Sequence, residues 1–119
     1  MSPYIYAGLK QQQNVPRSVA QIQAIVAEHY DLLPSELDTV SKRQPTLQAR
    51  HLVLYIYRLV QPTLHYTQLG KQCFAHPIGR KAVKYAITTI ENLLQFDEAF
   101  ALQVNTLLKT LHIPSSKNH

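Results

Sequence analysis

The stretch GRKAVK, residues 79–84, places three cations at the start of a predicted helix, directly after a turn that contains Pro77 and Gly79. Positive charge at a helix start opposes the helix dipole and costs roughly a few tenths of a kcal/mol per residue. Arg80, Lys81 and Lys84 could instead neutralise phosphates, because such cations release counterions and dominate affinity for nucleic acid. An external polyanion is therefore the simplest explanation for the arrangement.

The charge of the chain is unevenly distributed along the sequence. The net charge is +5, yet the segment between Thr39 and Ile90 contains eight cations and no Asp or Glu. The eight are Lys42, Arg43, Arg50, Arg58, Lys71, Arg80, Lys81 and Lys84. Such an uneven distribution of positive and negative charge indicates a polyanionic partner, and nucleic acid is the first candidate. A merely solvated basic surface is the alternative, although solvated surfaces normally mix the two signs.

Residues suited to contact double-stranded DNA fall into loop and helix positions. The candidates are Lys42, Arg43, Arg50, Thr67, Gln68, Lys71, Arg80, Lys81 and Lys84. Side chains at the start of a major-groove helix reach base edges, whereas the preceding helix holds the flanking backbone. We expect Arg58 to serve the fold, because it falls at the far end of its helix.

Catalytic interpretations have little support in the sequence. Cys73 and His76 are three residues apart, but Cys73 falls on the inner stripe of a predicted helix, so a core residue is the better interpretation. His51, His65 and His76 lack metal-ligand spacing. Gly70–Lys71 lacks the remainder of a phosphate-binding loop. We therefore expect no enzymatic activity, cofactor, metal or small-molecule substrate.

Length and composition limit the class of protein. A chain of 119 residues suits one domain with a real core. The single cysteine excludes an internal disulfide and favours a reducing, cytoplasmic location. The sequence contains neither a signal-peptide core nor an apolar run long enough to span a membrane.

Apolar periodicity predicts an all-α fold of five to six helices. The first expected helix runs from Ser18, with a capping box at Gln21, to about Tyr30, and a short helical turn follows at 34–38. A central buried helix begins at Thr46 and is closed by Pro62. Further helices are expected at about 66–74, 80–94 and 98–111, and Asp97 caps the last of them. Residues 1–17 are expected to form a flexible arm, 18–111 the domain, and 112–119 a frayed tail. The short helix, tight connection and basic helix outline a helix-turn-helix unit.

Four runs of the sequence together resemble the C-terminal DNA-binding domain of the bacterial chromosomal replication initiator DnaA. They are VAEHYDLLPSEL, KRQPTLQARHLVLYIYRL, QLGKQCF and AVKYAITTIENLL, within residues 18–111. The resemblance implies a fold like that of the Trp repressor and no ATPase module. It also implies that Lys42 and Arg43 lie in a loop that reaches the minor groove or backbone, that Arg50 binds phosphate, and that the recognition helix begins at Arg80.

The chain departs from this family where the recognition helix begins. The family has an Arg-Asp-His-Thr-Thr signature there, whereas this chain has IGRKA. We expect duplex binding with a changed or relaxed sequence preference. The alternative is a degenerate domain of the same fold that now serves as a protein-protein interaction module. A homodimer is a further alternative, with its seam on the tyrosines and aliphatics of the outer side of the central helix.

Overall fold

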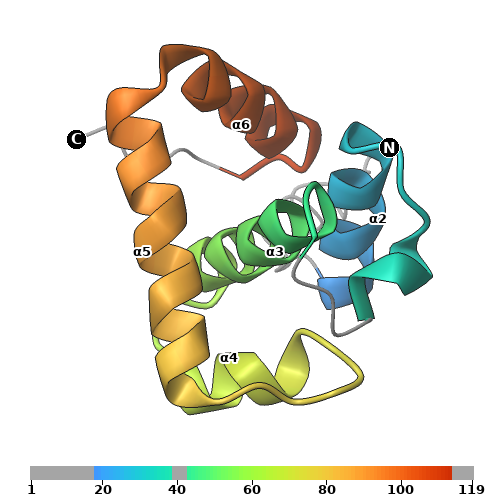
Figure 1. The fold of residues 1–119 in the computed structure, drawn as a ribbon, viewed down its shortest axis with the longest axis vertical. Helices are drawn as coiled ribbons and strands as arrows, with labels where there is room; N and C mark the ends of the chain where they lie inside the picture. Colours follow the sequence, from blue (N-terminus) through green and yellow to red (C-terminus); the bar gives the residue numbers. More distant parts are fainter. Residues whose placement is uncertain (1–17, 39–42, 114–119) are drawn as a thin grey trace, which may run out of the picture.

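The computed structural model describes residues 18–38 and 43–113 (Figure 1). The predicted arm at 1–17, the candidate Lys42 and residues 114–119 lie outside the described residues. The described residues form five α-helices, one 3-10 helix and no strand, which confirms the all-α prediction. The elements are α2 (Val19–His29), η1 (Pro34–Asp38), α3 (Thr46–Val60), α4 (Tyr66–Gln72), α5 (Arg80–Phe96) and α6 (Glu98–Thr110).

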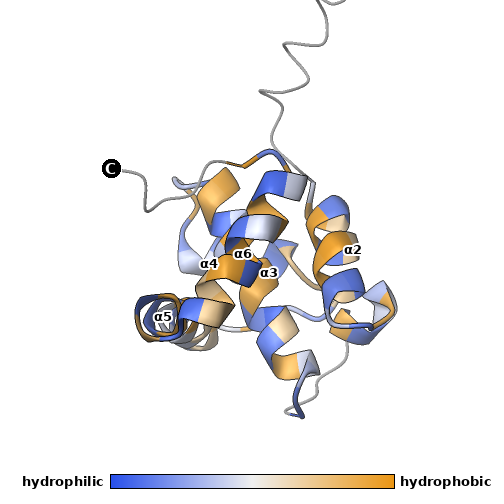
Figure 2. Cartoon of the chain, turned by 90° about the horizontal axis from the view of Figure 1, so that it is seen from above, coloured by the Kyte–Doolittle hydropathy of each residue, from blue (hydrophilic) through white to orange (hydrophobic). Residues whose placement is uncertain are grey.

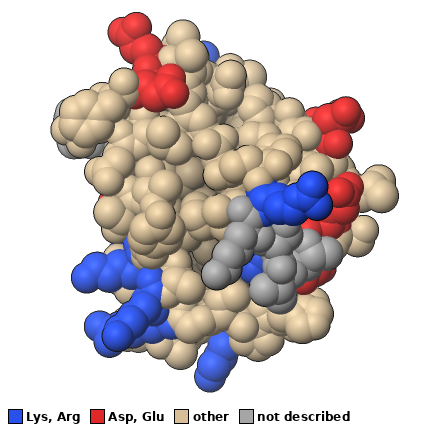
Figure 3. Space-filling view, viewed as in Figure 1, with Lys and Arg blue, Asp and Glu red and all other residues tan. Residues whose placement is uncertain are grey.

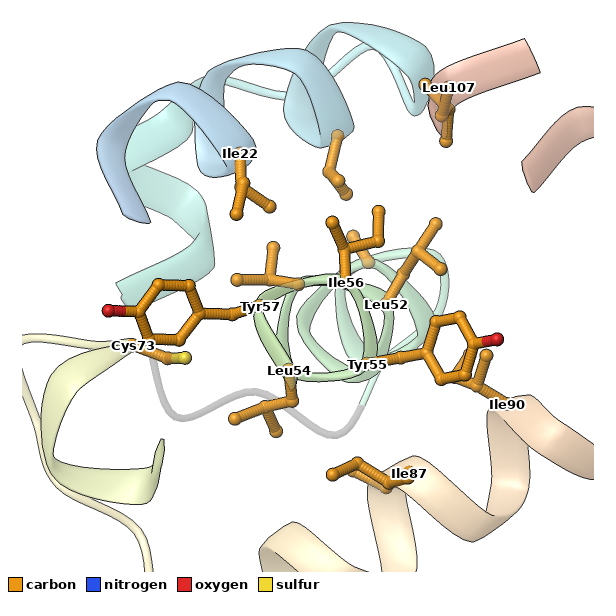
Figure 4. Packing of buried hydrophobic residues seen from close by; sticks show 14 of the residues in the cluster. Ile22, Leu52, Leu54, Tyr55, Ile56, Tyr57, Cys73, Ile87, Ile90 and Leu107 are labelled. Carbon is orange, nitrogen blue, oxygen red and sulfur yellow. The ribbon is translucent and has the colours of Figure 1, made fainter. Parts of the chain in front are cut away.

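Helix α3 runs through the middle of the molecule, and the other elements surround it (Figure 1). Figure 4 shows its side chains pointing outward in every direction, toward Ile22 of α2, Cys73 at the end of α4, Ile87 and Ile90 of α5, and Leu107 of α6. Tyr55 and Tyr57 are both buried in this core. The predicted dimer seam on the tyrosines of the central helix is therefore wrong, because neighbouring helices already cover them.

Local capping fixes the helix ends. The Ser18 hydroxyl accepts from the Gln21 N–H at 3.1 Å, and the Gln21 side chain accepts from the Ser18 N–H at 3.0 Å, so the predicted capping box is confirmed. Asp97 caps α6 by accepting from the Phe100 N–H at 3.0 Å. Helices α2 and α6 are each followed, two residues after their last residue, by a left-handed residue: Asp31 at φ 60° and His112 at φ 59°.

These left-handed residues turn the chain back onto the core. After α6, the Ile113 N–H donates to the Leu108 carbonyl at 2.8 Å and the His112 N–H donates to the Lys109 carbonyl at 3.0 Å. This pair of bonds is the Schellman arrangement, which satisfies the last carbonyls of a helix. Ile113 consequently packs against the hydrophobic core, two residues beyond the end expected from the sequence.

Helices α4 and α5 meet through a backbone contact at Gly70. The Ile78 N–H donates to the Gly70 carbonyl at 3.1 Å. A Cβ atom at position 70 would lie 2.2 Å from the Ile78 carbonyl oxygen and 3.1 Å from Val83 Cγ2. Only glycine fits this approach, so Gly70 sets how closely α5 follows α4.

The connection between these two helices is also held from the rest of the molecule. The Gln23 side chain on α2 donates to the Cys73 carbonyl at 2.6 Å. The Asp38 carboxylate accepts from the Ala75 N–H at 3.1 Å. Since both bonds come from the N-terminal part of the chain, the turn before α5 is fixed against α2 and η1.

Arg50 is a buried charge within α3, with 7% of its surface exposed. Its Nη1 donates to the Leu37 carbonyl at 2.7 Å, and its guanidinium carbon lies 4.4 Å from the centre of the Phe74 ring. Burial lowers the pKa of Arg50, and the nearby Asp38 charge acts in the opposite direction. Arg50 thus joins η1, α3 and the end of α4.

We expect Gly70→Ala to destabilise the fold by about 1–3 kcal/mol, because the new methyl group meets a backbone oxygen that cannot move aside cheaply. Urea unfolding followed by far-UV circular dichroism measures the change. Gly79→Ala is the matched control, since nothing lies within 4 Å of a Cβ atom there. Equal stability losses in the two variants would contradict the close approach at Gly70.

Arg50→Met should lower the free energy of unfolding by about 2–3 kcal/mol. The substitution keeps an apolar stem but removes a charged hydrogen-bond donor and leaves the Leu37 carbonyl without it. Arg80→Met is the matched control, because it removes an exposed cation from a helix start, where positive charge is unfavourable. The same urea titration distinguishes them; a loss for Arg50→Met no larger than for the control would show that Arg50 does not stabilise the fold.

Candidate nucleic-acid interface

Lys and Arg side chains gather at one end of the molecule, where α4 and the start of α5 lie (Figure 3). This basic end consists of Lys71, Arg80, Lys81 and Lys84, and all four side chains are exposed. No ion pair joins them to a carboxylate among the residues that the structure describes. Their charge is therefore available to an anion from outside.

The local structure of α5 explains why these cations face outward. Val83, Ala86, Ile87 and Ile90 form its buried stripe. Positions 80, 81 and 84 lie off that stripe and remain in solvent, as the period of the helix requires. The first turn of α5 contains no acidic residue, and its N-cap residue Gly79 provides no side-chain hydrogen bond. The exposed N–H groups of this turn add to the positive field of the cations.

A hollow of about 540 Å³ lies between the start of α4 and the start of α5. Its lining residues are His65, Tyr66, Thr67, Gln68 and Arg80. The structure thus brings Thr67 and Gln68 together with Arg80, as a shared surface of α4 and α5 requires. Gln68 also serves the fold, because its Oε1 accepts from the His65 N–H at 3.3 Å at the start of α4.

Tyr66 belongs to this hollow and is half-buried. Its ring lies under the Arg58 guanidinium, whose central carbon is 5.0 Å from the ring centre. Arg58 is half-buried there, which agrees with its expected place in the fold. The cation–π contact orients the tyrosine beside the hollow. No local spacing in the sequence links these two residues, because they belong to different helices.

Two further candidate cations that the structure describes, Arg43 and Arg50, do not join the basic end. Arg43 is exposed and precedes α3, at the end of that helix that lies away from α5 (Figure 1). The Arg50 guanidinium is buried against the Leu37 carbonyl and Phe74, so it is not presented to solvent. The expectation that Arg50 binds phosphate therefore has no support in this geometry, and its position is explained by the fold.

Two further titratable groups bear on the chemistry of the region. Burial, with the neighbouring Arg50 charge, lowers the pKa of His51 below its usual 6.5, so this residue adds no charge at pH 7. Its ring instead packs edge-on against Tyr85, with centres 5.9 Å apart. Burial raises the pKa of Cys73 to about 12, so its thiol stays protonated in the core.

The described residues contain no cluster of three or more His, Cys, Asp or Glu side chains that could hold a metal ion. Within the same ranges, no helix combines the length and apolar character that crossing a membrane requires.

Comparison with known proteins gives one similarity of note. Over 110 residues, the chain is 24% identical to the chromosomal replication initiator protein DnaA of Bacteroides thetaiotaomicron. The aligned part is 90% of this chain but 22% of that relative, so the chain spans about a fifth of the relative's length. No family model matches the chain, and no solved structure matches it. The chain is thus similar, at low identity and over most of its length, to part of a replication initiator.

Proposed function

We propose that this chain is a double-stranded DNA-binding protein, with α4 and α5 as a helix-turn-helix unit. The observation that carries the proposal is the basic end: Lys71, Arg80, Lys81 and Lys84 are exposed together on these two helices, without carboxylate partners among the described residues. The similarity to DnaA supports a DNA-binding domain of that type. The initiator's other activities are not part of the proposal.

In this proposal α4 binds the DNA backbone. Thr67 and Gln68 line the hollow with Arg80, where hydroxyl, amide and guanidinium groups can donate to the oxygens of one phosphate. Lys71 is exposed one turn farther along α4 and reaches the neighbouring phosphate. Such contacts set the orientation of the protein on the duplex but do not read sequence.

Helix α5 would then enter the major groove by its first turn. Arg80, Lys81 and Lys84 are the side chains there that can reach base edges or groove-lining phosphates. Arg and Lys favour guanine, whose N7 and O6 atoms both accept hydrogen bonds. Because this chain lacks the Arg-Asp-His-Thr-Thr signature of DnaA, we propose a changed or relaxed sequence preference. Lys42 and Arg43 remain proposed contacts of the loop before α3.

Arg80→Ala combined with Lys81→Ala should weaken binding to a random-sequence duplex by at least about tenfold at low salt, since two phosphate or base contacts are lost. Fluorescence anisotropy with a labelled duplex measures the affinity. Lys109→Ala is the matched control, because it removes an exposed cation from α6, away from the basic end. Equal affinities of the double variant and the wild type would remove α5 from the interface.

The affinity should also fall steeply with salt. If the four cations of the basic end each neutralise one phosphate, the slope of log affinity against log salt is about −3 to −4. The Arg80→Ala, Lys81→Ala variant should have a slope less negative by about 2, whereas Lys109→Ala leaves it unchanged. Absence of binding to any duplex at low salt would refute the proposed function and favour a protein-binding role for this fold.

A further inference from the structure

The outer side of α5 carries two exposed aromatic side chains. Tyr85 is 66% exposed and Phe96 is 80% exposed. They are eleven residues apart, which places both on one stripe of the helix, about 16 Å from each other. Between them lies a hollow whose lining also includes Thr89, Asn92, Leu93 and Asp97. Helix α5 forms the edge of the molecule in Figures 1 and 2, with its outer side turned away from the other helices.

The charges at the two ends of this stripe have opposite sign. Lys81 and Lys84 are exposed beside Tyr85, and Asp97 and Glu98 are exposed beside Phe96. Thr88, Thr89, Asn92 and Gln95, which lie between the two ends on the outer side, are uncharged. Glu91 is the exposed acid between them, and it lies at the side of α5, in a hollow that Arg58 and Tyr66 also line. A second helix packed along the stripe is attracted electrostatically at both ends only if its basic end meets Asp97 and Glu98 and its acidic end meets Lys81 and Lys84.

We propose that a second copy of this chain docks on this surface, with the two α5 helices antiparallel about a two-fold axis. In this arrangement Tyr85 of each copy faces Phe96 of the other, and Thr89 faces Asn92 at the centre. Lys84 of each copy then lies near Asp97 and Glu98 of the other. Such a pairing is isologous, so one surface satisfies both copies and no edge is left for further growth.

The other possible occupants fit less well. A polyanion is disfavoured because two carboxylates stand at one end of the stripe. The other large apolar residues that are exposed in the described ranges are Leu33, on the segment before η1, and Leu102, on α6. Neither has a second large exposed apolar side chain on its own element, since Phe100 of α6 is buried. Scattered residues of that kind are normal on protein surfaces.

The size of the surface determines how strong the pairing can be. Two helices of 17 residues packed along one stripe bury on the order of 1,000 Å² in total, which is the low end of specific interfaces. A reversible dimer with a dissociation constant in the micromolar range is therefore expected. The proposal does not rest on DNA binding, because the two aromatic residues lie outside the basic end. Lys84 belongs to both surfaces, so the second copy and a duplex compete for that side chain.

Sedimentation equilibrium of the full chain without DNA, from about 1 to about 200 µM, tests the pairing. The wild type should shift toward twice its monomer mass as concentration rises. Phe96→Asp should raise the dissociation constant at least about tenfold, because it places a charge opposite Tyr85 in an apolar contact. Leu102→Asp is the matched control: it changes another exposed apolar residue, 66% exposed, on α6 and should leave association unchanged.

A charge exchange tests the direction of pairing. Glu98→Lys alone should weaken association, since it faces Lys84 of the other copy, and Glu98→Lys with Lys84→Glu should restore it. Circular dichroism confirms that each variant is folded. A constant monomer mass at all concentrations would overturn the proposal, as would a dimer that Phe96→Asp leaves intact. Either result leaves the proposed DNA binding standing, because no duplex is present in the measurement.

Discussion

The backbone contact between Gly70 and Ile78 is the constraint on which the geometry of the basic end depends. It brings α4 and α5 so close that no Cβ atom fits between them. Val83, one turn into α5, lies at the same point, with its Cγ2 3.1 Å from where a Cβ atom of residue 70 would be. Because this contact involves main-chain atoms, it leaves little freedom to adjust. It therefore fixes where Arg80 lies relative to Thr67 and Gln68, which belong to the preceding helix.

The individual helices could be predicted because each depends on residues a few positions apart. Ser18 and Gln21 cap α2 across three residues, and Asp97 caps α6 by a bond to the Phe100 N–H. The outward direction of Arg80, Lys81 and Lys84 likewise followed from the period of the helix. By contrast, the sequence around Gly70 does not indicate why a glycine is needed there, because the atom that excludes a side chain is the carbonyl oxygen of Ile78, beyond the end of α4. The bonds from Gln23 and Asp38 to the turn before α5 were equally hidden, since the partners lie far apart in sequence.

Arg50 shows how a local signal can be misread. Its charge placed it with the surface cations, yet it stands in a helix that is apolar almost all round. Because such a helix has no side that faces solvent fully, the Arg50 side chain, about one turn from its start, must find hydrogen-bond partners inside the protein. The Leu37 carbonyl and the Phe74 ring provide them, and the Asp38 charge offsets part of the desolvation. The apolar surroundings of Arg50 were the signal that could have separated it from Arg80.

Helix α5 has charges at both ends that oppose its own dipole. Three cations occupy its first turns, and Asp97 follows its last residue, where it serves instead as the N-cap of α6. These end effects cost about 1–2 kcal/mol in total. By comparison, burial of Val83, Ile87 and Ile90 contributes roughly 1.5–3 kcal/mol for each side chain, and Ala86 adds a smaller amount. Packing against α3 and α4 therefore outweighs the unfavourable electrostatics and allows both ends to carry charges that the isolated helix would disfavour. Charges that destabilise their own helix are best explained by what they meet outside it. A phosphate at the first turn or an antiparallel α5 from a second copy would each bring opposite charge to these ends.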